Sequence, residues 1–595
     1  MANTPRGTSP ARRRGGGSPL GKRGAAGADE MPPLALALRV PLLLSAPADE
    51  AAPSPQPTRA ARGITALVVG VALAAAAAGG AAGIAFAGGA RQQPQLAAST
   101  APAAPATTPL PLLRPPPHVI AHRGASGLLP EHTLPAYAAA LASGADYLEC
   151  DVHLTADLFP ICRHDPDLST TTDAREQFPD RARRRAIDES EGGGEPAADG
   201  VFACDLTLAE VRTLKARQRW PEDRGVAHDG AYGVATLDEL LALVDAWRGQ
   251  GWQRGQALGQ EQQPQHHHQQ QPRVVGVYPE TKHAAWHDRE FSARWRRRDA
   301  RLLAGLRALE AGNATAGLPS DSSSGGRLLE RVVASRLLAA GYGGRGPVGS
   351  DAWRARPALV QSFELESLRA VAWLAEQGQK AAAAAGGTTA AAVSAVLSAR
   401  LPPVLPRAQQ GKNALPLVLL LGGWPGWKTA DTGETLPQQL ERLGRWSREV
   451  DGAGPWKELL FEVGGGGGHH HHHASAAVAT THGGDVAAAE AEAEDEQGHP
   501  ALAPPKPSGL LARLKAAGLV VHAYTVRHER RFVLPGFGGS AAREMQALFG
   551  GGGNGEGGNG ASAPWSSSSS LDGAFADFPA AMVGFLVGEG LRSAS

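Results

Sequence analysis

Several polar residues that could act together on a charged ester lie within one short stretch of the chain, residues 118–173. They form four groups: His122-Arg123, Glu131, Glu149-x-Asp151 and His164-Asp165. Most of these groups stand at or just beyond the end of a short apolar run, which is the pattern of a buried β-strand. This stretch therefore holds the residues best suited to chemistry, and the elements around it must position them.

The spacing of these residues indicates the kind of reaction. Glu149 and Asp151 are two positions apart, so on a strand their side chains face the same side. Two such carboxylates repel each other unless a cation lies between them, and Ca²⁺ or Mg²⁺ with oxygen ligands is the simplest choice. His122 and His164 can exchange protons near neutral pH, and Arg123 presents a planar set of donors suited to a phosphate. Together these groups indicate cleavage of a phosphate ester.

The motifs around these residues resemble those of the glycerophosphodiester phosphodiesterase family, especially its bacterial periplasmic-type members. The segments that carry the resemblance follow the family's order: HRGASG, PEHTLPAY, GADYLECDVHLT, RHDP, DLTLAEVRTLKARQRWP (205–221), TLDELLALV (236–244), VYPETK (277–282), VQSFE (360–364), VHAYTVR (521–527) and DGAFADFP (572–579). An isolated HRG motif is a weak signal, whereas an ordered series of ten segments is a strong one.

The resemblance implies roles for particular residues. The metal ligands are expected to be Glu149, Asp151 and Glu280, and the catalytic residues His122 and His164. The expected substrate-binding residues are Arg123, Lys282, Glu131, Gln361 and Tyr524. For Glu131, capping a helix or bracing a loop is an equally good interpretation. Tyr524 stands where many relatives carry Trp, so the aromatic wall is kept while its fit to glycerol is in doubt.

Eight apolar runs have the length and composition of strands: residues 118–122, 146–154, 159–163, 273–279, 358–362, 416–421, 519–524 and 573–577. Most are followed by a segment with helical spacing. This periodicity alone indicates an α/β protein. The resemblance implies a (β/α)8 TIM barrel, whose active site lies at the C-terminal ends of the strands.

The composition predicts a barrel with insertions rather than a compact protein of 595 residues, since there are 75 Gly and 45 Pro and only 5% aromatic residues. We expect a disordered N-terminal region (1–62), a candidate transmembrane anchor (63–90), a Pro/Ala-rich spacer (91–117) and a catalytic barrel (118–590). Low-complexity inserts are expected near residues 249–272, 311–326, 380–410, 464–505 and 538–570.

Residues 63–90 carry no charge, lie between Arg62 and Arg91, and are numerous enough to cross a bilayer. More basic residues precede this segment than follow it before residue 117, which favours a cytoplasmic N-terminus and a lumenal or extracellular barrel. Two other interpretations stay open. The segment could be Ala-rich low-complexity sequence, or residues 1–117 could be a cleaved targeting region of an organellar or secreted protein.

The chain has three cysteines, Cys150, Cys162 and Cys204, which do not form the pattern of a disulfide framework. Because Cys150 lies between Glu149 and Asp151, its side chain should face the opposite side of the strand, toward packing helices. We interpret it as a buried structural thiol.

Three functions fit the sequence. The first is metal-dependent hydrolysis of glycerophosphodiesters to glycerol 3-phosphate and an alcohol in glycerophospholipid breakdown, with a small-molecule substrate. The second is a lysophospholipase D acting on lipids. The third is a non-catalytic, membrane-tethered barrel, which the presence of all five expected metal and catalytic residues disfavours. The 58 basic residues balance the 58 acidic ones, so charge gives no argument for nucleic-acid binding. No protein partner is inferred.

Overall fold

The computed structural model describes residues 116–187, 198–257, 274–311, 326–343, 350–411, 413–424, 426–462, 505–550 and 570–593. At its centre is a closed barrel of eight parallel strands. These are β1 (His118–Ala121), β2 (Tyr147–Leu154), β6 (Gly276–Thr281), β7 (Val360–Ser362), β8 (Leu417–Leu421), β9 (Gly452–Pro455), β10 (Val520–Val526) and β11 (Gly573–Ala576). The strands neighbour one another in chain order, and β1 closes the barrel by pairing with both β2 and β11. The predicted (β/α)8 TIM barrel is therefore confirmed.

One predicted barrel strand was assigned wrongly. The run 159–163 does contain a strand, β3 (Pro160–Cys162), but β3 pairs antiparallel with β2 and lies outside the barrel. The barrel strand missing from the prediction is β9, whose sequence is GAGP. Glycine and proline are depleted in strands, so composition gave no signal for β9. Its glycines suit its place, because a Cβ at Gly452 would lie 2.9 Å from the backbone oxygen of Val520.

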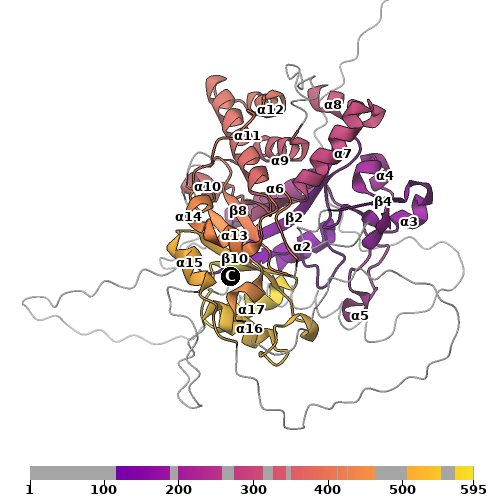
Figure 1. The fold of residues 1–595 in the computed structure, drawn as a ribbon. Coiled ribbons are helices and arrows are strands. Elements are labelled where there is room, and N and C mark those ends of the chain that lie inside the picture. The colour runs from indigo at the N-terminus through magenta and orange to yellow at the C-terminus, as the bar shows by residue number, and fades with distance from the viewer. Residues whose placement is uncertain are drawn as a thin grey trace, which may run out of the picture. The chain divides into compact units, whose positions relative to one another are not determined.

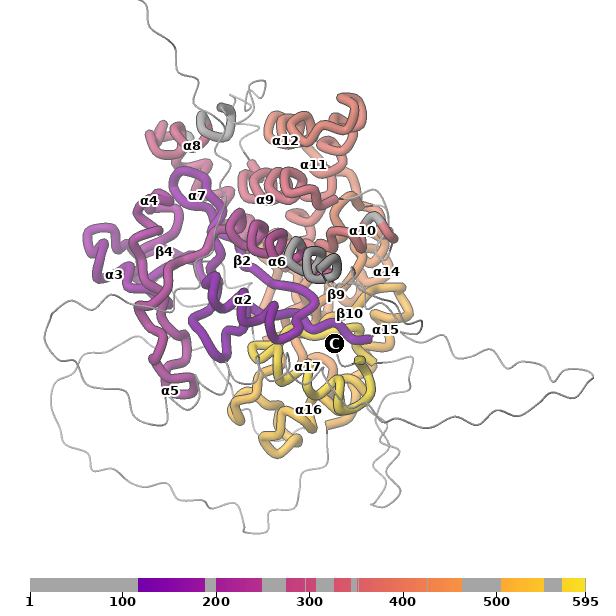
Figure 2. Tube along the Cα trace, turned by 180° about the vertical axis from the view of Figure 1, so that it is seen from behind, coloured from indigo at the N-terminus to yellow at the C-terminus, as the bar shows by residue number. Residues whose placement is uncertain are grey.

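Helices follow the barrel strands and surround them, as the views from opposite sides in Figures 1 and 2 show. They are α2 (Leu134–Ala142), α6 (Leu237–Ala257), α7 (Ala284–Arg296), α8 (Ala300–Ala311), α9 (Leu328–Ala339), α10 (Asp351–Ala355), α11 (Leu365–Ala384), α12 (Thr389–Ser398), α13 (Leu436–Glu441), α14 (Leu443–Trp446), α15 (Leu510–Ala516), α16 (Ala541–Phe549) and α17 (Pro579–Gly588). Short 3-10 helices η5 (Lys457–Leu460) and η6 (Arg530–Phe532) follow β9 and β10.

Alternation along the strands separates two hydrophobic layers. The inner cluster fills the barrel and contains Ile120, Tyr147, Tyr278, Leu359, Val418 and Phe575. The intervening residues, such as Leu148 and Cys150 on β2, pack outward against the helices in the main core. Because side chains alternate along a strand, Glu149 and Asp151 face the barrel interior together with Tyr147. They lie above it, toward the C-terminal end of β2.

The chain makes a long excursion between β2 and α6, seen to one side of the barrel in Figures 1 and 2. After β3 it contains η1 (Leu168–Thr170), α3 (Ala174–Gln177), η2 (Pro179–Arg181), β4 (Arg183–Arg185), β5 (Ala198–Gly200), η4 (Ala203–Asp205), α4 (Leu208–Val211) and α5 (Pro221–Arg224). The excursion has a small core of its own, which includes Leu168, Val201 and Leu214. The last part of this excursion returns to the C-terminal ends of the barrel strands.

Some stretches predicted as inserts contain ordered helices. The segment 380–410 includes the end of α11 and all of α12, whose Ala392 and Val396 pack against Ala334 and Leu338 of α9. The segment 538–570 begins with α16, and the segment 249–272 begins inside α6. In α16 the apolar positions Met545 and Leu548 are buried at helical spacing, a signal that the neighbouring glycine-rich sequence concealed.

The predicted anchor at residues 63–90, the N-terminal region and the spacer up to residue 115 lie outside the described residues. So do most of the predicted inserts at 311–326 and 464–505. Within the part of the chain that the structure describes, no helix combines the length and apolar character needed to cross a bilayer.

Candidate active site

The strand register brings the predicted metal ligands to one level at the C-terminal end of the barrel. Asp151 on β2 lies directly opposite Glu280 on β6, and Glu280 lies opposite Gln361 on β7. Glu149 lies one inward-facing position below Asp151. All three carboxyl groups are buried, with at most 4% of each residue exposed. Each must therefore be compensated by neighbouring groups, because a buried charge is costly without a partner.

Neighbouring groups compensate the negative charge of these carboxylates only in part. Glu149 accepts a hydrogen bond from the backbone N–H of Arg123 at 2.6 Å, while its Oε1 is buried and has no hydrogen-bond partner. Burial, with Asp151 nearby, raises the pKa of Glu149 well above its usual value. Burial also raises the pKa of Glu280 to about 8, although Lys282 opposes this shift. Both shifts arise first from burial, which makes the charged forms costly, and three oxygen donors at one level fit a hard divalent cation that would offset this cost.

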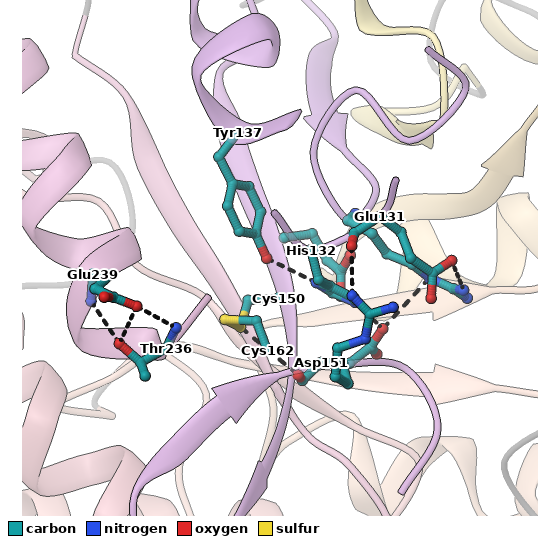
Figure 3. The surroundings of a disulfide bond; sticks show 11 residues. Glu131, His132, Tyr137, Cys150, Asp151, Cys162, Thr236 and Glu239 are labelled. Atoms are coloured by element: carbon teal, nitrogen blue, oxygen red, sulfur yellow. Dashed lines mark hydrogen bonds and ion pairs between the residues drawn. A yellow bond between two sulfur atoms is a disulfide. The ribbon is translucent and has the colours of Figure 1, made fainter. Parts of the chain in front are cut away.

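His132 is a site residue that the sequence analysis missed. Its Nε2 lies 2.9 Å from Asp151 Oδ2 and its Nδ1 lies 2.8 Å from the hydroxyl of Tyr137, as Figure 3 shows. Ligand atoms of His132, Glu149 and Asp151 lie within 4.8 Å of one another, so this group could hold a metal ion. Because both ring nitrogens already have partners, we interpret His132 as orienting Asp151. Glu280, an oxygen donor, is the better third ligand for a hard cation.

Two cationic side chains face the carboxylates. Lys282 Nζ lies 3.1 Å from Glu280 Oε1 and 3.7 Å from Asp151 Oδ1. Arg123 Nε lies 3.5 Å from Asp151 Oδ2, and its NH1 donates to Glu131 at 3.0 Å. Arg123 is held with a left-handed φ of 60°, a conformation that is costly for a residue with a side chain. This backbone shape turns its N–H toward Glu149.

His122 is oriented by Asp577, which directly follows β11. Its Nδ1 lies 2.6 Å from Asp577 Oδ1 in the buried site. The other carboxylate oxygen of Asp577 accepts from Arg224 at 2.6 Å and from Arg527 at 2.8 Å. Burial opposes ionisation of Asp577, but Arg527 and Arg224 outweigh it and hold its pKa well below the usual value. Asp577 is therefore a fixed negative acceptor for the ring of His122.

His164 has the same kind of partner. Its Nδ1 lies 2.6 Å from Oδ1 of the adjacent Asp165. Arg219 donates to Asp165 Oδ2 at 2.8 Å and makes a two-pronged ion pair with Glu131 at 2.7 and 2.8 Å. Arg219 and Arg224 both come from the end of the excursion, so one short segment supports both histidines.

Burial favours the neutral form of both histidines. Burial, with Arg123 nearby, lowers the pKa of His122 to about 4. Burial, Arg123 and Lys282 hold the pKa of His164 well below its usual value. Because a carboxylate accepts the proton on each Nδ1, each ring keeps its Nε2 lone pair for the pocket. The site thus presents two proton-transfer groups beside a cationic and metal-binding centre.

Nine of the ten predicted site residues line one pocket, and only Glu131 is absent from its lining. Glu131 is buried behind Arg123 and Arg219 and bonds to both, so it braces the arginines. Gln361 Oε1 is buried without a hydrogen-bond partner. The hydroxyl of Tyr524 donates to the backbone oxygen of Leu421 at 3.1 Å, which fixes its ring in the wall of the pocket.

The cysteines differ from the prediction. Cys150 does face the helices, but it is joined to Cys162 of β3 by a disulfide, with 12 positions between them. Figure 3 shows the two sulfur atoms beside the strand that carries Asp151. The bond ties the strand of the metal ligands to the strand that precedes His164. Two cysteines twelve positions apart gave no sign of the antiparallel β2–β3 pairing that brings them together. Cys204 is a free, buried thiol.

Residues 122–308 match the model of the glycerophosphoryl diester phosphodiesterase family. A glycerophosphodiester phosphodiesterase of Arabidopsis thaliana is 30% identical over 255 residues, which is 42% of this chain and 51% of that protein. A glycerophosphodiester phosphodiesterase of Haemophilus influenzae is 38% identical over 108 residues, or 18% of this chain and 26% of that protein. The chain thus matches about half of the length of the first relative and about a quarter of the second.

Among solved structures, a phosphodiesterase of Oleispira antarctica, in complex with the product sn-glycerol-3-phosphate, is 15% identical. The alignment covers 79% of this chain and 97% of that chain, with a TM-score of 0.32.

Proposed function

The chain carries a domain of the glycerophosphoryl diester phosphodiesterase family, and on that premise we propose that it hydrolyses glycerophosphodiesters to glycerol 3-phosphate and an alcohol. The observation that carries the proposal is the convergence of three carboxylates, two cations and two carboxylate-supported histidines in one pocket. Each group suits a different need of phosphodiester cleavage, namely metal binding, charge neutralisation and proton transfer.

Glu149, Asp151 and Glu280 would hold the divalent cation, which we propose to be Ca²⁺ or Mg²⁺ because all three side chains offer oxygen ligands. When bound, the cation would stabilise negative charge on the phosphate oxygens. Arg123 and Lys282 contribute positive charge on the same side of the pocket. Lys282 is a point charge, whereas Arg123 can bond two phosphate oxygens at once.

The histidines would move the protons. One Nε2 accepts the proton of the attacking hydroxyl, which is water or, as the family resemblance implies, the substrate's own glycerol hydroxyl; in the second case a cyclic phosphate forms and water then opens it to glycerol 3-phosphate. The other ring, which takes up a proton when the anionic phosphate binds, gives this proton to the oxygen of the departing alcohol as the phosphorus–oxygen bond breaks. Asp577 and Asp165 hold the rings in the required tautomer and stabilise the imidazolium that forms. The two pairs have the same arrangement, so either histidine can be the base and the other the acid.

Incubating the full-length chain with glycerophosphocholine, glycerophosphoethanolamine and lysophosphatidylcholine tests the proposal. We expect glycerol 3-phosphate and the free alcohol from the two water-soluble diesters. Faster release of choline from lysophosphatidylcholine would favour the lysophospholipase D alternative instead. No release from any of the three, with metal present, would favour a non-catalytic barrel.

We also propose that the barrel works in an oxidising compartment, lumenal or extracellular. The Cys150–Cys162 disulfide supports this proposal, because such bonds persist outside the cytosol. The predicted orientation of residues 63–90 agrees with it. Protease protection on sealed microsomes, with a tag at each end, tests it. Protection of the C-terminal tag is expected, and its digestion in intact vesicles would contradict the proposal.

A further inference from the structure

Aromatic rings line part of the pocket, and one of them, Phe363, lies beside Lys282, whose Nζ is 5.5 Å from the centre of the ring. Phe363 and Trp456 directly follow β7 and β9, Trp424 follows β8, and Tyr524 belongs to β10. All four line the pocket, and we call them the aromatic box. Neighbouring rings have centroids 6.0 Å apart and stand nearly perpendicular: 75° for Phe363–Trp424, 78° for Trp424–Trp456 and 86° for Phe363–Tyr524.

The aromatic box offers ring surface and few polar groups. Trp424, Trp456 and Tyr524 are part-buried, so each keeps some exposed surface. The hydroxyl of Tyr524 already bonds to Leu421. An electron-rich ring face attracts a cation, and aromatic rings around one space are a favourable site for a quaternary ammonium. Lys282 already lies over the ring of Phe363, so Trp424, Trp456 and Tyr524 are the rings that remain for a ligand.

A carboxylate lies in the wall of the same pocket. Glu458, two residues after Trp456, lines the pocket, and within the described residues its carboxylate forms no hydrogen bond or ion pair. The neighbouring Lys457 makes no ion pair with it, since Lys457 Nζ donates to Glu544 at 2.8 Å and to the backbone oxygen of Phe532 at 2.6 Å. Burial raises the pKa of Glu458 to about 7, although the charge of Lys457 opposes this shift. A bound cation would supply that charge.

A phosphodiester held by Arg123, Lys282 and the metal ligands sends two arms into the pocket. A glycerol arm carries two hydroxyls that need hydrogen-bond partners, which the aromatic box does not supply. An acyl chain would suit the rings but would gain nothing from Glu458. A positively charged arm gains from both features. On the basis of the proposed hydrolysis, we propose that the aromatic box and Glu458 bind the leaving alcohol and select a cationic amino alcohol.

The test compares two substrates that differ in the charge of one arm, glycerophosphocholine and glycerophosphoglycerol, with the full-length chain. We expect kcat/KM to favour the choline ester by about tenfold, in line with a desolvated cation–π contact. Trp424→Leu and Glu458→Gln should each reduce this ratio several-fold. Trp247→Leu and Glu462→Gln, both at exposed positions outside the pocket, are the matched controls and should keep the ratio.

A binding readout separates selection from folding. Tetramethylammonium chloride should inhibit hydrolysis of glycerophosphoglycerol competitively in the wild type and more weakly in Trp424→Leu, with sodium chloride as the ionic control. Equal turnover of both esters with no inhibition would overturn the inference while the proposed hydrolysis stands. A ratio that survives in both pocket variants would also overturn it. If neither ester is hydrolysed, the proposed function fails and the inference fails with it.

Discussion

At the scale of single residues, the site depends on carboxylates that never meet the substrate. Asp577 and Asp165 each hold the Nδ1 of one histidine at 2.6 Å. Both histidines could be placed from the sequence, and Asp165 was grouped with His164, but neither aspartate was assigned a role in the site. Asp165 is the next residue after His164, and Asp577 lies in the family-like DFP motif, so both were visible. Their function was not, because it depends on contacts that span up to 455 positions.

We predict that His122→Ala and His164→Ala each lower kcat by about 10²- to 10⁴-fold, the usual cost of removing a general acid or base. Metal affinity should change little, since neither histidine is a proposed ligand. Steady-state kinetics with metal in excess measures the effect. His228→Ala, outside the pocket, is the control. Normal turnover in either variant would show that its histidine does not act in the reaction.

The pH dependence of kcat/KM should change when Arg527, which donates to Asp577, is replaced. Arg527 lowers the pKa of His122, so Arg527→Met should raise that pKa from about 4. If His122 is the base, its ring must be neutral to accept a proton, so the acidic limb of kcat/KM should move to higher pH; if His122 is the acid, the basic limb should move to higher pH. Arg531→Met, from the same pocket wall, removes an arginine that pairs with Asp223 instead. A lower plateau with an unmoved limb in Arg527→Met would contradict this account of His122.

At the scale of elements, the β2–β3 pair joins the metal ligands to the histidine loop. Backbone bonds pair Val152 with Cys162, and the N–H of Arg163 donates to the oxygen of Asp151 at 2.9 Å. The disulfide adds a covalent link on the buried side of the pair. His164 therefore leaves β3 at a fixed position relative to Asp151.

Removing this link should cost stability. We predict that the Cys150→Ala/Cys162→Ala double variant loses about 3 kcal/mol of unfolding free energy, the loop-closure value for a short loop. Urea unfolding under oxidising conditions measures it. Cys204→Ala, which removes a buried thiol without a cross-link, is the control. If the double variant were no less stable than this control, the disulfide would not be a structural constraint.

Elements with strong apolar patterns could be predicted, whereas those made of small residues could not. The LVLLL run of β8 is buried at every position and was recognised. The GAGP run of β9 is the next strand of the barrel, and its glycines leave room for its neighbours. Side chains of β8, Val418 and Leu420, and backbone oxygens of β10 fill the space where a Cβ would lie. The predicted number of eight barrel strands was right only because β3 was counted in place of β9.

At the scale of the whole molecule, the ordered motifs predicted the barrel. Nine of the ten site residues that were taken from these motifs line one pocket in the structure. The motifs did not predict how the excursion between β2 and α6 returns to the site. Arg219 lies inside the motif 205–221 that supports the family resemblance, and Arg224 lies just beyond it. Their carboxylate partners Glu131, Asp165 and Asp577 are separated from them in sequence, so only the fold shows the connection.

The central claim is that carboxylates at the end of β2 and β6 hold a divalent cation needed for phosphodiester cleavage. Release of glycerol 3-phosphate from a glycerophosphodiester should be measured on the full-length chain after chelation and during titration with Ca²⁺ or Mg²⁺. Wild type should lose its activity with chelator and regain it with metal. Glu149→Gln should need a higher metal concentration and turn over more slowly, because it deletes ligand charge. Wild-type turnover that persists unchanged in chelator, with Glu149→Gln equally active, would contradict the claim.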